Sequence, residues 1–118
     1  MDIFGFTGFW KEQNALIVAF RGTVDIQNWI ADLTFDEVDY PGCSGCRVHE
    51  GFYDAYQTVG GYVRKQVQTL TSLYRGCSIY VTGFSLGGAL ATMAALDLKE
   101  AFGKVDEFYT FGQPRVGN

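Results

Sequence analysis

Apolar and aromatic runs in the first twenty positions predict a β-hairpin. Residues 4–10 (FGFTGFW) have the aromatic content of a short strand, and the polar residues 11–14 (KEQN) are expected to form a turn. Residues 16–20 (LIVAF) are all apolar, which is typical of a strand that lies inside a sheet. The second strand of this hairpin is therefore expected to have neighbours on both sides.

Two helices are expected in the next part of the chain. Between residues 24 and 33, four apolar residues share one side at helical spacing, namely Ile26, Trp29, Ile30 and Leu33. Residues 35–48 contain a proline and two glycines and are expected to be irregular. Residues 51–74 have the strongest amphipathic pattern of the chain. Gly60 and Gly61 interrupt that pattern, so a bend or a close packing contact is expected there.

The last third of the chain alternates between strand and helix patterns. Residues 78–82 (SIYVT) and 108–111 (FYTF) have strand patterns, and residues 85–101 between them have a long helical pattern. Such alternation predicts an α/β fold, with a mainly parallel sheet and helices covering both of its faces. No internal repeat or domain boundary is visible, so residues 1–118 are expected to belong to one domain.

Composition and charge exclude several classes of protein. Of the 118 residues, 47% are hydrophobic and 19% are charged, which is not the composition of a disordered chain. The net charge is −4 and no stripe of Lys or Arg occurs, so nucleic acid is a poor candidate partner. No apolar run reaches the roughly 18 residues of a transmembrane span. Residues 1–4 lack the basic and apolar regions of a signal peptide.

Two of the three cysteines are close together in the sequence. Cys43 and Cys46 lie in a loop rich in Pro and Gly, where a small disulfide is the favoured interpretation and free thiols are the alternative. A zinc site would need Cys77 and His49 as its other ligands, and a redox Cys-x-x-Cys would normally open a helix. Cys77 precedes an apolar run and is expected to be a buried thiol.

The strongest indication of chemistry lies in residues 80–91 (YVTGFSLGGALA). Gly83-x-Ser85-x-Gly87 stands directly between a predicted strand and a predicted helix, which is the context of a nucleophile elbow. The turn requires glycines because the serine has a strained backbone and neighbouring Cβ atoms would collide. Ser85 is therefore predicted to be a nucleophile whose hydroxyl is raised clear of the sheet. The alternative is that the motif is only a tight turn between strand and helix.

A serine that cleaves esters also needs donors for the oxyanion of its tetrahedral intermediate. In the elbow arrangement one donor is the backbone N–H after the nucleophile, here that of Leu86, and the second comes from the loop after an earlier strand. That loop is residues 20–23 (FRGT), so Thr23 is the second candidate. This mechanism needs no metal and no organic cofactor.

These segments resemble the fungal-type triacylglycerol lipases, also called the class 3 lipase family, of the α/β-hydrolase superfamily. Five stretches carry the resemblance, in the family's order and over nearly the whole chain: residues 18–23 (oxyanion strand), 28–33 (lid helix), 43–52 (loop before the long helix), 83–91 (elbow) and 109–118 (next strand and loop). The resemblance implies a partial α/β-hydrolase fold. Secreted fungal members carry a disulfide in the loop that corresponds to Cys43 and Cys46, so the resemblance also implies secretion.

The resemblance places the remaining triad residues beyond the end of this chain. In the family the catalytic Asp and His follow the segment that resembles residues 114–118 (PRVGN). His49, the only histidine, precedes Ser85 and is interpreted as structural. Asp97, inside a predicted helix, and Asp106, just before the last strand, are both poorly placed for a triad acid. The family usually has His before the nucleophile, whereas this chain has Phe84, which removes no catalytic group.

The resemblance further implies a lid that contains Trp29, Ile30 and Leu33. Such a helix would cover the site in water and turn its apolar face toward a lipid surface. From periodicity alone, the same residues would form an ordinary helix packed on the core.

The expected function is hydrolysis of carboxylic esters, above all triacylglycerols, at a transient lipid–water interface. A feruloyl-type esterase of the same family is the close alternative. A non-catalytic remnant or interaction module is the alternative from another class, because a serine without its base retains only residual activity.

Overall fold

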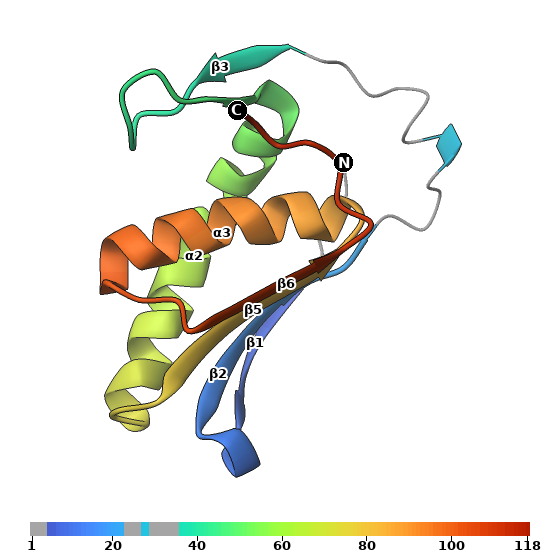
Figure 1. Ribbon diagram of the computed structural model, residues 1–118. Helices are drawn as coiled ribbons and strands as arrows, with labels where there is room; N and C mark the ends of the chain where they lie inside the picture. The colour runs from blue at the N-terminus through green and yellow to red at the C-terminus, as the bar shows by residue number, and fades with distance from the viewer. Residues whose placement is uncertain (1–4, 23–26, 29–35) are drawn as a thin grey trace.

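The computed structural model, which describes residues 5–22, 27–28 and 36–118, contains a four-stranded sheet beside two long helices (Figure 1). The strands β1 (Gly5–Trp10) and β2 (Ala15–Phe20) form an antiparallel hairpin through the short 3-10 helix η1 (Lys11–Gln13). The strand β5 (Ser78–Phe84) pairs parallel to β2, and β6 (Glu107–Phe111) pairs parallel to β5. The order β1-β2-β5-β6 confirms the predicted α/β fold with a mainly parallel sheet and an N-terminal hairpin.

Both long helices lie on the same face of the sheet, so the prediction of helices on both faces is wrong for the described residues (Figure 1). The helix α2 (Glu50–Leu73) connects β4, defined below, to β5, and α3 (Leu86–Phe102) connects β5 to β6. The strand order moves in one direction from β2 to β5 to β6. Right-handed crossovers that progress in one direction place their helices on one face.

The register of the strands separates a buried face from an open one. Leu16, Val18, Ile79 and Val81 are at most 1% exposed and face the helices, where they form the core with the apolar sides of α2 and α3. Alternation along the paired strands puts a second set of residues on the opposite face. This set, called the aromatic face below, consists of exposed aromatic side chains: Phe6, Trp10, Phe84, Tyr109 and Phe111.

The region expected to be irregular contains two short strands. The strand β3 (Glu37–Asp39) pairs antiparallel with β4 (Arg47–His49), and Val48 of β4 is buried in the core. The prediction for residues 35–48 is therefore wrong in this part. Strands of three residues are too short to show an alternating pattern, and their pairing depends on contacts with the far end of the chain, described below.

The helix α2 is continuous through its glycines. Gly60 is buried, and a Cβ at this position would lie 3.0 Å from the ring of Tyr56, so the glycine allows close packing, one of the two predicted outcomes. The Tyr56 hydroxyl donates to Asp97 of α3 at 2.7 Å, and Arg64 of α2 pairs with the same carboxylate at 2.7 Å. These contacts join α2 to α3.

The helix predicted between residues 24 and 33 lies outside the described residues except at two positions. Gln27 and Asn28 are helical and exposed. Among the residues described, no helix has the length and apolar character that crossing a bilayer requires.

Candidate active site

Ser85 lies in the turn between β5 and α3 and has the backbone conformation of an elbow. Its φ is 55° and its ψ is −119°, a combination that residues with a side chain rarely adopt. Its amide donates to the carbonyl of Phe111 at 2.7 Å, and its carbonyl accepts from Gly88 at 2.9 Å and from Ala89 at 3.3 Å. The serine is therefore held by the last residue of the neighbouring strand and by the first turn of the helix that follows it.

Three backbone segments meet at this serine, and glycines allow their approach. A Cβ on Gly83 would collide with the carbonyl of Gly87, and a Cβ on Gly87 would collide with the carbonyl of Phe20. A Cβ on Gly22 would lie 3.2 Å from the Cβ of Ser85. Because β2, β5 and β6 are parallel, their carboxyl ends share one edge of the sheet, and Ser85 lies at that edge.

Ser85 is almost fully enclosed. The residue is 5% exposed, and its hydroxyl makes no capping hydrogen bond to α3. Leu86, the first residue of α3, is 2% exposed. The first N–H groups of a helix have no acceptor within the helix, so the Leu86 amide has no helical partner and is next to the serine.

The other residues predicted for the site fall outside the described residues. Thr23, the second predicted oxyanion donor, is one of them, and so are the predicted lid residues Trp29, Ile30 and Leu33. Gly22, which directly precedes Thr23, is described, and the small space beside it, in which an added Cβ would meet Phe84 and Ser85, shows that the start of the loop after β2 lies at the elbow.

His49 has a structural role, as its position in the sequence indicated. It is the N-cap of α2, where its Nδ1 accepts from the amide of Phe52 at 3.3 Å. The imidazole also stacks on the Phe52 ring, with a centroid distance of 4.1 Å, and His49 is 7% exposed. An N-cap of this kind satisfies a helix donor.

Asp97 and Asp106 also have structural partners. Asp97 accepts from Tyr56 and Arg64, as described above, and burial together with this hydrogen bond raises the pKa of the Tyr56 hydroxyl. Asp106 accepts from the amide of Ile79 at 2.8 Å at the start of β5. Both carboxylates stabilise the fold.

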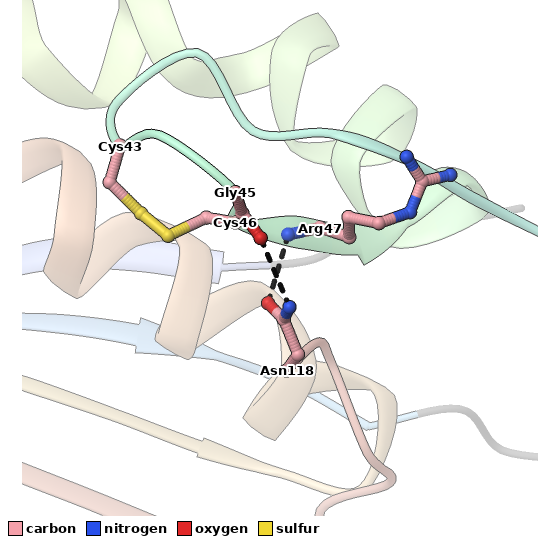
Figure 2. Close-up of a disulfide and its surroundings, with 5 residues drawn as sticks. All are labelled: Cys43, Gly45, Cys46, Arg47 and Asn118. Carbon is pink, nitrogen blue, oxygen red and sulfur yellow. Dashed lines mark hydrogen bonds between the residues drawn. A yellow bond between two sulfur atoms is a disulfide. The ribbon is translucent and has the colours of Figure 1, made fainter.

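The structure links Cys43 to Cys46 by a disulfide, and Cys77 is a buried thiol. The disulfide closes the loop between β3 and β4, in agreement with the favoured interpretation of the spacing. Asn118 lies against this loop and hydrogen-bonds to it through its side chain (Figure 2). Sequence analysis did not single out this residue, although Asn side chains in turns and loops often hydrogen-bond to backbone groups. Within the described ranges, no group of three or more His, Cys, Asp or Glu side chains could hold a metal ion.

Comparisons with known proteins agree on one family. The family model for class 3 lipases matches residues 17–118. A lipase from Rhizomucor miehei is 44% identical over 110 residues, which are 90% of this chain and 30% of that protein. Secreted mono- and diacylglycerol lipase A from Penicillium cyclopium is 32% identical over 117 residues, which are 99% of this chain and 38% of that protein.

A solved structure shows the same arrangement of elements. It is a triacylglycerol lipase whose catalytic centre is described as a serine protease triad, and it is 42% identical with a TM-score of 0.90. The match covers 97% of this chain and 44% of that one. The chain spans about a third of the length of the two curated relatives named above.

Proposed function

The chain belongs to the class 3 lipase family, and from that premise we propose that Ser85 is the nucleophile of a secreted carboxylic ester hydrolase that acts on acylglycerols. The observation that carries this proposal is the conformation of Ser85. A serine with φ of 55°, placed where three strand ends meet and followed at once by a helix, is the arrangement of a nucleophile elbow. A simple turn between strand and helix does not require a strained serine, because glycine adopts such backbone angles without cost.

The chemistry assigned to these residues is acyl transfer. The Ser85 hydroxyl attacks the ester carbonyl, and the N–H groups of Leu86 and Thr23 hold the oxyanion of the tetrahedral intermediate. The alcohol then leaves with a proton, and water releases the acyl group from the serine. A histidine and an acid, encoded after Asn118 in the α/β-hydrolase order, would remove and return the proton. Residues 1–118 would be one part of a single hydrolase domain.

Two further features support the proposed setting. Ser85 is 5% exposed, so a substrate needs an opening step, which is the role assigned to the helix with Trp29, Ile30 and Leu33. The disulfide between Cys43 and Cys46 is typical of proteins in oxidising compartments, and the Penicillium relative is named as secreted. The substrate surface would be a lipid–water interface.

The first test is to read the transcript beyond the codon for Asn118 and to express the complete product. Hydrolysis is measured on a tributyrin emulsion and on methyl ferulate. We expect activity on the emulsion, and a loss of at least about a thousandfold in Ser85→Ala. Ser72→Ala, on an exposed turn of α2, is the matched control and should be fully active. A stop codon directly after Asn118, or an active Ser85→Ala protein, would refute the proposal, and preference for the ferulate would favour the feruloyl-type esterase.

The lid is tested separately with Trp29→Ala. We expect the activity on emulsions to fall more than the activity on a dissolved monomeric ester, because only the emulsion requires contact with a lipid surface. Equal activity of the wild-type protein and Trp29→Ala on emulsions would argue against the lid and for an ordinary helix packed on the core.

A further inference from the structure

The segment after β6 connects the candidate nucleophile to the disulfide loop. It begins directly after Phe111, whose carbonyl accepts the Ser85 amide at 2.7 Å. Gly112 turns the chain with a φ of 63°, and the side chain of Gln113 lies 3.2 Å from where a Cβ of Gly88 would be. The start of this segment is thus in contact with the elbow and with the first turn of α3.

The end of the segment pairs with β4 as an added strand. The amide of His49 donates to the carbonyl of Val116 at 2.6 Å, and the amide of Asn118 donates to the carbonyl of Arg47 at 3.1 Å. Val48 lies opposite Gly117 in an antiparallel bridge, and a Cβ on Gly117 would collide with the carbonyl of Arg47. The backbone of residues 116–118 therefore lies close beside β4.

The side chain of Asn118 completes this contact by bonding on both sides of Cys46 (Figure 2). Its Oδ1 accepts from the amide of Arg47 at 2.9 Å, and its Nδ2 donates to the carbonyl of Gly45 at 3.2 Å. A carboxamide has a donor and an acceptor on one planar group, so a single short side chain can make both bonds.

The disulfide keeps the two partners of this amide in place. Gly45 has a φ of 76°, and Cys46 between the two partners is bonded to Cys43. The carbonyl of Cys46 also accepts from the amide of Tyr40 at 2.8 Å, which fixes the base of the loop. Without the covalent link, the loop would be held by its backbone hydrogen bonds and by the exposed ion pairs of the Arg47 guanidinium with Glu37 and Asp39.

We propose that Asn118 is a positioning residue for Ser85: its carboxamide and the Cys43–Cys46 disulfide together hold the segment that follows Phe111, and this segment keeps the Phe111 carbonyl against the Ser85 amide. This inference rests on the proposed role of Ser85 as nucleophile. A shift of the Phe111 carbonyl would release one of the hydrogen bonds that keep Ser85 in its strained conformation. Catalysis depends steeply on such placement, since misplacement by about 1 Å can reduce the rate by about a hundredfold.

The test measures hydrogen exchange of the Ser85 amide in the complete, oxidised protein and in Asn118→Ala. We expect exchange about tenfold faster at Ser85 and unchanged at Val81 in the middle of β5, on the scale of one or two neutral hydrogen bonds. Asn118→Asp keeps the acceptor for Arg47 but turns a carboxylate oxygen toward the carbonyl of Gly45, so it should also accelerate exchange at Ser85. Gln68→Ala, which removes an exposed amide from α2, is the matched control and should change neither rate. Equal acceleration at Ser85 and Val81, or none at Ser85, would overturn the proposal.

Ester hydrolysis gives a second readout. In Asn118→Ala, kcat is expected to fall by about tenfold with an unchanged KM, since the variant alters the nucleophile and leaves the substrate pocket intact. If the wild-type protein hydrolyses no ester, the proposed function fails, while the exchange rates still decide whether Asn118 positions Ser85.

A double-mutant cycle tests the role of the disulfide. Replacing both Cys43 and Cys46 by serine should also accelerate exchange at Ser85, and adding Asn118→Ala should then have an effect of less than about twofold, because the partners of the amide are already loosened. If the loss of the disulfide and Asn118→Ala accelerate exchange at Ser85 by independent factors that multiply, the disulfide and Asn118 do not act through one contact.

Discussion

Replacing Ser85 by alanine and by glycine separates the strain of the serine backbone from its chemistry. Ser85 has a φ of 55° and a ψ of −119°. A residue with a Cβ in such a sparsely populated conformation costs on the order of 1–3 kcal/mol. Alanine keeps the Cβ and therefore the strain, whereas glycine removes both. Both variants lack the nucleophile and should be inactive in the hydrolysis assay.

The expected magnitude follows from a comparison with Ala94, which is 0% exposed and lies within α3. Ala94→Gly should lower the free energy of unfolding by about 2 kcal/mol, the sum of about 1 kcal/mol for glycine in a helix and about 0.8 kcal/mol for the lost methyl burial. Changing alanine to glycine at residue 85 should cause similar losses, but it also removes the Cβ and so releases about 1–3 kcal/mol of strain. Glycine and alanine at residue 85 should therefore differ in stability by no more than about 1 kcal/mol.

The assay is equilibrium unfolding in urea, with equal m-values required for the comparison. The informative quantity is a difference between two losses of unfolding free energy: the loss caused by Ala94→Gly minus the loss between the alanine and glycine variants at residue 85. We expect this difference to be about 1–3 kcal/mol. Equal costs at both positions would mean that Ser85 is not strained, and the interpretation of its conformation as an elbow would lose its physical basis.

Three further predictions follow from the same structure. Gly83→Ala should destabilise the protein by about 3 kcal/mol, because its Cβ would collide with the backbone of Gly87. Gly61→Ala, on the exposed side of α2, should instead stabilise the protein by about 1 kcal/mol, and unfolding in urea measures both changes. Burial and the hydrogen bond to Asp97 raise the pKa of Tyr56 above its ordinary 10.0, so its contribution to stability is complete below pH 10 and is lost as the pH rises above that value. Tyr56→Phe should therefore reduce the fall in unfolding free energy above pH 10, and an unchanged pH profile would contradict this assignment. The isolated 118-residue chain should self-associate through the aromatic face, and a monodisperse monomer at micromolar concentration in sedimentation velocity would contradict that expectation.

The elements that sequence analysis predicted correctly are those with local signals. The apolar run in β2 and the alternation around β5 and α3 mark their elements within one window of residues. The Gly83-x-Ser85-x-Gly87 motif indicated the elbow because the strand and the helix that it joins are adjacent in the sequence. The disulfide between Cys43 and Cys46 was predictable for the same reason, since its partners are separated by three positions.

What sequence analysis could not predict depends on contacts between distant residues. The face on which α2 and α3 lie is set by the strand order, and no local pattern encodes that order. The strands β3 and β4 are three residues each, and β4 is completed by residues 116–118. The bonds of Asn118 span 71 and 73 positions, so only the folded chain reveals them.

The same long-range register explains why a strained serine persists at this place. Phe20 lies opposite Gly83 in the β2–β5 pair, and Phe84 lies opposite Phe111 in the β5–β6 pair. The two pairings bring Gly22 and the Phe111 carbonyl to Ser85 from opposite sides, and the first turn of α3 holds its carbonyl. Relief of the strain would require at least one of these contacts to break, and they belong to a sheet whose inner face is buried. The packing of the whole sheet therefore offsets the free energy of the strained conformation. Glycine at residue 85 should relieve this strain, whereas alanine, which keeps the Cβ, should not.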